Sequence, residues 1–142
     1  MKELEKIARY VSDRLLDEGF IIQRYNAYST DSIYLKLDYG AANSIRISNH
    51  PGKKHLRYRY NIILDGQTED VMDTYIRHYY KPEDVDSMLE VIINKKKEDI
   101  QRYGENGYQK CMQMNIKEHE NDKKGFWAHA RIIGGRKNNA QN

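Results

Sequence analysis

The chain has 142 residues, which is enough for one domain with a single hydrophobic core. Hydrophobic residues make up 39% and charged residues 32%, so we expect a modest core beneath a heavily charged surface. One cysteine, Cys111, excludes an internal disulfide, and no apolar run approaches the roughly 20 residues of a membrane span. With no signal-peptide pattern at the start of the chain, these features predict a cytoplasmic protein.

The first predicted element is a helix over residues 2–18, and Gly19 follows it as a C-terminal stop. Apolar residues recur there at spacings of three and four, which places them on one face of a helix. This apolar stripe consists of Leu4, Ile7, Ala8, Val11 and Leu15.

The hydrophobic period changes to two after Phe20, which predicts strands. In the fourth strand, alternation points Tyr58 and Tyr60 inward, and Asp65-Gly66 is expected to end the strand. The fifth segment also has a helical stripe, but its β-branched and aromatic content favours a strand. The predicted strands are 20–26, 32–38, 44–49, 55–64 and 71–80.

A long helix is predicted to begin at Pro82, because proline and the acidic residues after it suit a helix N-terminus. We expect it to run to about Arg102, where Gly104 interrupts it, and to resume over residues 108–119. Residues 121–142 are basic and polar, with one apolar pair, Phe126-Trp127, and are expected to form a flexible tail.

Together these elements predict an α+β fold, with residues 1–120 as a single domain and 121–142 as its tail. The N-terminal helix precedes an antiparallel sheet of three to five strands, because the connections are too short for parallel crossovers. The long C-terminal helix should pack on the apolar sheet face and leave the other face exposed.

Charge is distributed unevenly, with a net +4 over residues 19–66, −5 over 67–122 and +5 over 123–142. No Asp or Glu occurs between Tyr39 and Leu64. Cations on a strand face can neutralise phosphates or acidic protein surfaces, although they also protect sheet edges. The candidate partner-binding residues are Lys36, Arg46, Ser48, Asn49, His50, Lys53, Lys54, Arg57, Arg59 and Asn61.

The basic tail is a second candidate contact, as an electrostatic arm or a solubilising end. Its cations are Lys123, Lys124, Arg131, Arg136 and Lys137.

The sequence shows no strong pattern for a catalytic site or a metal-binding site, so we expect a non-enzymatic protein without cofactors. No nucleophile, base and orienting acid occur at a recognised spacing, and no glycine-rich phosphate loop is present. A weak metal site could only combine His50, His55, Cys111 and His119, whose spacing matches no strong ligand signature.

One segment carries a resemblance to known proteins. Ser32-x-Tyr34, the run Ile45-Arg46-Ile47-Ser48-Asn49-His50 and Lys54-His55 resemble small proteins of phages and mobile elements of low-GC Gram-positive bacteria. More specifically, they resemble a broad-acting type II-A anti-CRISPR protein of streptococcal phages. The resemblance covers about residues 30–55 and the helix–sheet–helix order.

The resemblance implies a phage-encoded inhibitor that binds Cas9 or its guide RNA complex in the bacterial host cell and blocks DNA cleavage. The chain departs from this relative in one respect, since its basic arm is C-terminal and the relative's is N-terminal. A sequence-tolerant nucleic-acid-binding module of a mobile element is the alternative. The candidate partners are therefore Cas9, its guide complex, or RNA or DNA alone.

Overall fold

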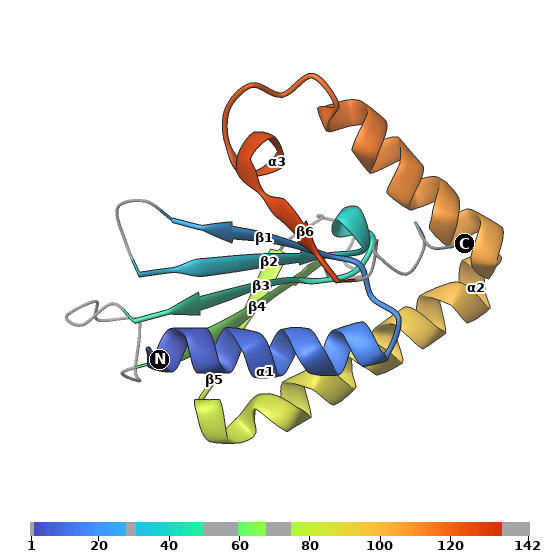
Figure 1. The fold of residues 1–142 in the computed structure, drawn as a ribbon. Coiled ribbons are helices and arrows are strands. Elements are labelled where there is room, and N and C mark those ends of the chain that lie inside the picture. The colour runs from blue at the N-terminus through green and yellow to red at the C-terminus, as the bar shows by residue number, and fades with distance from the viewer. Residues whose placement is uncertain (1, 28–30, 50–59, 68–74, 135–142) are drawn as a thin grey trace.

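The computed structural model describes residues 2–27, 31–49, 60–67 and 75–134, which form the α+β fold expected from the sequence (Figure 1). Its longest helix is interrupted by charged residues, so no helix of the described ranges could span a bilayer. In chain order the elements are α1 (Glu3–Asp17), β1 (Ile22–Asn26), β2 (Ile33–Leu37), η1 (Asp38–Gly40), β3 (Ser44–Ser48), β4 (Asn61–Gln67), β5 (Tyr75–Tyr80), η2 (Pro82–Asp84), α2 (Val85–His119), α3 (Phe126–His129) and β6 (Arg131–Ile133).

The six strands form one antiparallel sheet in the order β5-β4-β3-β2-β1-β6. The sequence predicts five of them at most, and the sixth comes from the segment assigned to the flexible tail. Residues 131–133 pair with β1 along the free edge of the sheet, with Gln23 opposite Ile132. Three residues are too few for a period-two pattern to be visible. The rest of the tail, residues 135–142, lies outside the described residues.

The pair formed by β4 and β5 also differs from expectation. The strand break predicted at Asp65-Gly66 is wrong, because β4 continues through both residues to Gln67. Asp65 lies opposite Arg77 of β5, and their side chains form an ion pair at 3.2 Å. β5 itself confirms the strand predicted within residues 71–80.

One sheet face, which we call the helical face, is covered by α1 and the first part of α2, which lie side by side (Figure 1). Alternate strand residues such as Leu35, Ile45 and Ile62 point into this core and are at most 1% exposed. The predicted stripe of α1 packs on them. Arg24, a buried cation on the same face, is satisfied by an ion pair with Glu5 of α1.

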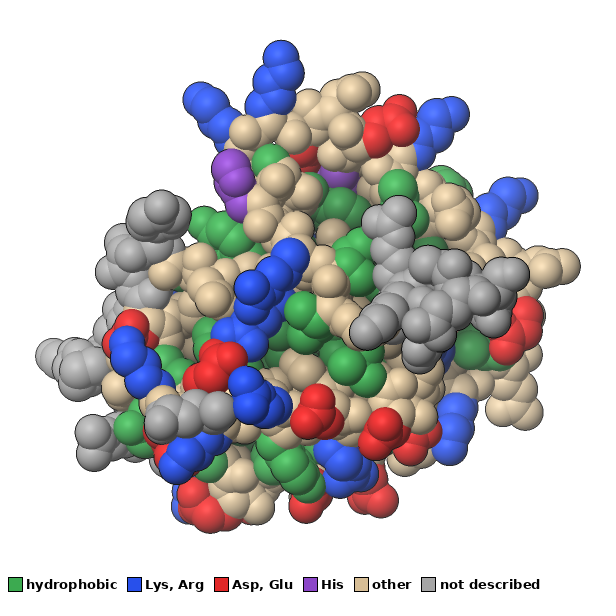
Figure 2. All heavy atoms as spheres, in the orientation of Figure 1, with side chains coloured by type: hydrophobic (Ala, Val, Ile, Leu, Met, Phe, Trp, Pro, Cys, Tyr) green, Lys and Arg blue, Asp and Glu red, His purple; other side chains and the backbone are tan. Residues whose placement is uncertain are grey.

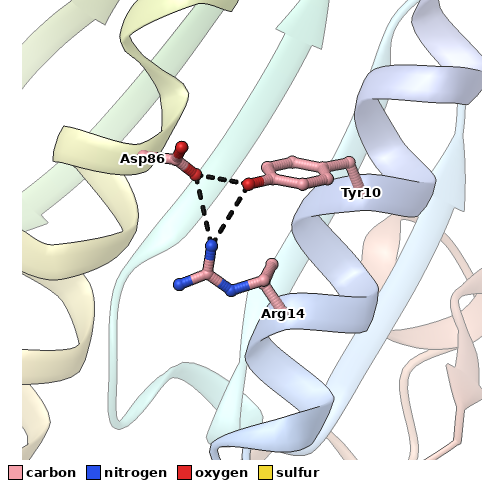
Figure 3. A network of polar contacts seen from close by, with 3 residues as sticks. All are labelled: Tyr10, Arg14 and Asp86. Atoms are coloured by element: carbon pink, nitrogen blue, oxygen red, sulfur yellow. Dashed lines mark hydrogen bonds and ion pairs between the residues drawn. The ribbon is translucent and has the colours of Figure 1, made fainter.

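A surface network joins the two helices that share this face. Arg14 of α1 donates to the Tyr10 hydroxyl at 3.1 Å and to the Asp86 carboxylate of α2 at 3.3 Å, and Tyr10 also donates to Asp86 (Figure 3). Because the three groups are exposed, solvent screens their interactions. The network therefore helps to orient α1 relative to α2 but adds little to the free energy of unfolding.

The long helix α2 changes direction at Gly104, as the sequence suggests. This residue has φ 79° and ψ 161°, a backbone conformation that is essentially restricted to glycine. Around the kink, Asp38 of η1 lies buried at 1% exposure. Its carboxylate accepts from the Ile21 amide at 2.8 Å, from the Tyr108 hydroxyl at 2.6 Å and pairs with Lys96 at 2.9 Å. The network therefore fixes both halves of α2 against the sheet.

Beyond the kink, α2 continues past the end of the sheet, and the chain returns to the opposite face. Asn115 donates to the carbonyl of Tyr39 at 3.0 Å, and α3 then packs over β1 and β2. The prediction that this second face stays exposed is thus wrong in part. Ile63, which points to it from β4, is only 5% exposed.

The Asp38 network leads to a stability prediction. Asp38→Asn keeps the side-chain shape and tolerates the left-handed backbone at φ 49°, but leaves the buried end of Lys96 without its counter-ion. We expect a loss of about 3 kcal/mol in the free energy of unfolding, measured by urea denaturation. Asp13→Asn, at an exposed position of α1, is the matched control. A loss no larger than that of the control would contradict the role given to Asp38.

Candidate functional site

The second face carries a groove of about 710 Å³ between the middle strands, η1, the end of α2 and α3. Strand pairing brings Lys36 of β2 opposite Ser44, and Arg46 of β3 opposite Tyr34, so all four side chains point to this side of the sheet. We call it the aromatic groove, and the residues that define it are Tyr34, Lys36, Tyr39, Ser44, Arg46, Asp65, Arg77, His119, Phe126 and Trp127.

The rings of the aromatic groove come from segments far apart in the sequence. Trp127 of α3 stacks with His119 of α2 at 4.3 Å between ring centres and 8° between planes. It also stacks with Tyr39 of η1 at 6.3 Å and 25°. Phe126 meets Tyr25 edge to face at 6.0 Å. These contacts hold α3 on the sheet and build one wall of the groove.

η1 sets the position of the Tyr39 ring through unusual backbone geometry. Asp38 and Tyr39 have φ values of 49° and 54°, in the left-handed region that is uncommon for a bulky residue. The three hydrogen-bonded contacts to the Asp38 carboxylate and the bond from Asn115 to the Tyr39 carbonyl hold this conformation. The Asp38 network thus supports the groove as well as the fold.

Lys36 lies half-buried below the rings of α3. Its ammonium is 5.1 Å from the centre of the Phe126 ring and 5.9 Å from that of Trp127. In the described part of the chain no carboxylate forms an ion pair with it. Burial therefore lowers the pKa of Lys36 below its ordinary value of 10.5, against a smaller opposing effect of Asp65.

Arg46 is the second half-buried cation of the groove. Its guanidinium lies 5.3 Å from the centre of the Tyr34 ring and makes one long hydrogen bond, 3.4 Å, to the Ser32 hydroxyl. The Nε atom is covered and has no hydrogen-bond partner among the described residues. Lys36 and Arg46 thus form a positive pair, and the nearby Asp65 carboxylate, which is paired with Arg77, offsets the charge of Lys36 only in part.

The predicted partner-binding residues divide into three groups. Lys36 and Arg46 lie in the aromatic groove. Ser48 and Asn61, which face each other across β3 and β4, are both 0% exposed, so the prediction that they form an accessible surface is wrong. Asn49 is half-buried, with its side-chain carbonyl oxygen covered. The others, His50, Lys53, Lys54, Arg57 and Arg59, lie outside the described residues, as does Tyr58.

The burial of Ser48 and Asn61 has a physical reason. The Ser48 hydroxyl lies 3.4 Å from that of Ser32, itself 1% exposed, so these polar side chains form a covered cluster at one end of the sheet. Alternation along a strand assigns a residue to a face, but it does not tell what packs on that face.

The basic tail divides in the same way. Lys123 and Lys124 are exposed in the link between α2 and α3, and Arg131 is exposed in β6, whereas Arg136 and Lys137 lie outside the described residues. None of the three described cations lines the aromatic groove.

The weak metal combination finds no geometric support in the described residues, where no three His, Cys, Asp or Glu side chains converge as ligands would. His119 is stacked on Trp127 and has its Nδ1 2.8 Å from the Asp122 carboxylate, and Cys111 is free and exposed. His50 and His55 lie outside the described ranges.

A second hollow, of about 380 Å³, adjoins the Asp38 network. Three of its polar groups are bound to one another, since Asp38 is paired with Lys96 and accepts from Tyr108. Burial and the Asp38 charge raise the pKa of Tyr108, so its hydroxyl stays protonated as a donor and does not act as a base. The Asp38 network at this hollow therefore has a structural role.

Surface charge elsewhere is mixed. Figure 2 shows Lys, Arg, Asp and Glu side chains interspersed over the α1 and α2 side of the molecule, which is typical of a solvated surface. Lys36 and Arg46 of the groove, which form no ion pair with a carboxylate of the described residues, differ from this pattern. The sequence identified both by face and charge, but it could not show that Phe126 and Trp127 cover Lys36, because the path of α2 brings those rings there.

The desolvation of Lys36 predicts an unusual stability effect. Lys36→Met keeps the linear aliphatic chain and removes a half-buried charge, so we expect a higher melting temperature at pH 7, whereas Lys6→Met on exposed α1 should change little. Since the pKa of Lys36 is lower in the folded state, the unfolded chain binds more protons and the wild type gains stability as pH rises toward 10.5. The advantage of the variant should therefore shrink over that range. A lower melting temperature for Lys36→Met would contradict the conclusion that burial of the Lys36 charge destabilises the folded protein.

Comparison with known proteins gives no further constraint. No family model matches the chain, and neither a curated protein nor a solved structure is significantly similar to it. The chemistry of the aromatic groove itself therefore carries the functional inference.

Proposed function

We propose that this protein is a non-enzymatic nucleic-acid-binding protein that uses the aromatic groove to bind its ligand. The observation that carries the proposal is the pair of half-buried cations, Lys36 and Arg46, which form no ion pair with a carboxylate of the described residues and lie in a groove of about 710 Å³. Neither cation is paired with a carboxylate among the described residues, and although aromatic rings lie near both, each keeps hydrogen-bonding capacity that a bound anion would satisfy.

Nucleic acid fits this site better than a small carboxylate does. Its phosphates supply repeated negative charge, so two cations on neighbouring strands can each meet one phosphate. The groove is also long enough to involve Arg77 of β5, although that residue is already paired with Asp65. His119 is paired with Asp122 and Cys111 lines the same groove, but no hydrogen bond between Cys111 and His119 is seen in the described residues, and binding alone accounts for the features of the groove.

The direct test is binding of fluorescently labelled, mixed-sequence RNA and DNA oligonucleotides across a range of salt concentrations. We expect affinity that falls steeply with salt, as counter-ions are released from each neutralised phosphate. Arg46→Glu should abolish binding, whereas Arg9→Glu on the exposed surface of α1 should retain it. Absence of binding at low salt, or equal binding by both variants, would overturn the proposal.

The resemblance of residues 45–50 gives a second candidate, inhibition of Cas9 by binding the nuclease or its guide RNA complex. Residues of this run form β3, and its one cation, Arg46, points into the aromatic groove. Ser48 is buried and Asn49 largely so, which gives these residues a structural role beside the groove. On this proposal Arg46 is the residue of the run that contacts the partner, and the protein is a phage anti-defence factor.

A DNA-cleavage assay with several Cas9 orthologues tests this second candidate. We expect the wild-type chain to block cleavage by at least one guide-loaded orthologue, and Arg46→Glu to lose the block while Arg9→Glu keeps it. Uninhibited cleavage by every orthologue would rule the candidate out. Inhibition without any affinity for bare oligonucleotides would instead favour it over the general nucleic-acid-binding role.

A further inference from the structure

The rings of the aromatic groove already have partners within the protein. Trp127 stacks with both His119 and Tyr39, and Phe126 packs edge to face on Tyr25. A nucleobase that stacked on Trp127 or Phe126 would have to compete with these contacts, which also hold α3 on the sheet. The groove is therefore poorly suited to reading bases by stacking, in contrast to sheets whose rings stand free on the surface.

Unlike the rings, Lys36 and Arg46 keep unused hydrogen-bonding capacity among the described residues. Lys36 has no ion pair within the described residues, and Arg46 has one long hydrogen bond to Ser32 and an Nε without an acceptor there. Arg77, on the same face of the sheet, is paired with Asp65 at 3.2 Å. Hydrogen-bonding capacity thus remains at Lys36 and Arg46, where an anionic oxygen would satisfy it.

The register of β2 and β3 places these two cations within reach of one ligand backbone. Lys36 lies opposite Ser44 and Arg46 opposite Tyr34, so the two cations are diagonal neighbours on adjacent strands. The backbones of such neighbours lie about 7 Å apart, and the Arg46 guanidinium turns toward Ser32, away from Lys36, so the two cations can contact separate phosphates of one strand. Ser44 adds a hydroxyl donor on the same face.

The depth of the site decides between single-stranded and duplex ligands. Lys36 is half-buried beside the rings of Phe126 and Trp127, so its ammonium does not protrude from the surface. A duplex is a stiff cylinder whose phosphates meet protruding cations, whereas a single strand can bend into a groove.

We infer that Lys36 and Arg46 form a subsite for the phosphodiester backbone of a single strand, which the groove binds without regard to base identity. This inference rests on the proposed nucleic-acid-binding function and specifies its ligand: single-stranded, recognised through phosphates, with the protein's own rings serving as walls and not as stacking platforms.

Trp127 provides the measurement, because it is the only tryptophan of the chain and lies 5.9 Å from the Lys36 ammonium. Its fluorescence can be followed while the protein is titrated with four probes of equal length. The probes are two single strands of unrelated sequence, an abasic strand that retains the phosphodiester backbone, and a duplex. Binding of the duplex and of each strand is checked independently by anisotropy with labelled probes.

We expect the two sequences and the abasic strand to bind within about threefold of one another, since bases contribute little at a phosphate subsite. The duplex should bind at least about tenfold more weakly. Lys36→Met and Arg46→Met should each reduce the slope of log affinity against log salt by about 0.7, the value for one phosphate of a single strand. The matched controls, Lys6→Met and Arg9→Met on α1, should leave the slope unchanged.

The outcomes distinguish failure of the backbone subsite from failure of the proposed nucleic-acid-binding function. If no probe binds, the nucleic-acid-binding function fails and the subsite with it. If base-bearing strands bind and the abasic strand does not, or if the duplex binds as well as the single strands, the function stands and the backbone subsite is overturned. Unchanged salt slopes in both groove variants would also overturn the backbone subsite. Because Lys36→Met is expected to be more stable than wild type, a folding defect would not explain a loss of binding in that variant.

Discussion

Asp38 places a carboxylate, 1% exposed, where the start of β1, η1 and both halves of α2 meet. Taking a charge out of water is expensive unless it is paired and hydrogen-bonded, and Asp38 meets this condition with three partners. Lys96 precedes the kink at Gly104 and Tyr108 follows it, so one carboxylate determines how α2 bends. That bend carries the chain past the end of the sheet and on to its second face. Without it, α3 and β6 would not reach β1.

The aromatic groove follows from this path. Stacking of Trp127 on His119 and Tyr39 brings α3 over the sheet, and α3 in turn encloses Lys36, which the strand pattern alone would leave in water. Enclosure lowers the local dielectric and strengthens any interaction of Lys36 with an anion. The same enclosure destabilises the charged side chain while the groove is empty. Local instability and affinity for an anion therefore have one cause, which is typical of binding sites.

Much of the fold could be predicted from local sequence patterns. The stripe of α1, the alternation in β2 and β3, the strand character of β5 and the interruption of the long helix at Gly104 all depend on residues close together in the chain. The residues of the candidate functional site were harder to predict from the sequence. Lys36 and Arg46 were identified by face and charge, but Ser48 and Asn61, assigned to the same face by the same alternation, are buried in a polar cluster. Periodicity cannot distinguish these pairs.

By itself the sequence determined the α+β class, the antiparallel order and the sheet face that carries cations, because these follow from the periods of helix and strand and from the lengths of the connections. Tertiary structure alone decided which cations lie in a groove, which rings surround them and where the sixth strand pairs. Those features join β2, α2 and α3 across more than eighty residues, and they depend on a buried charge network and on ring contacts that leave no local pattern in the chain. The physical reason is that burial is a property of the assembled layers, whereas periodicity is a property of each element.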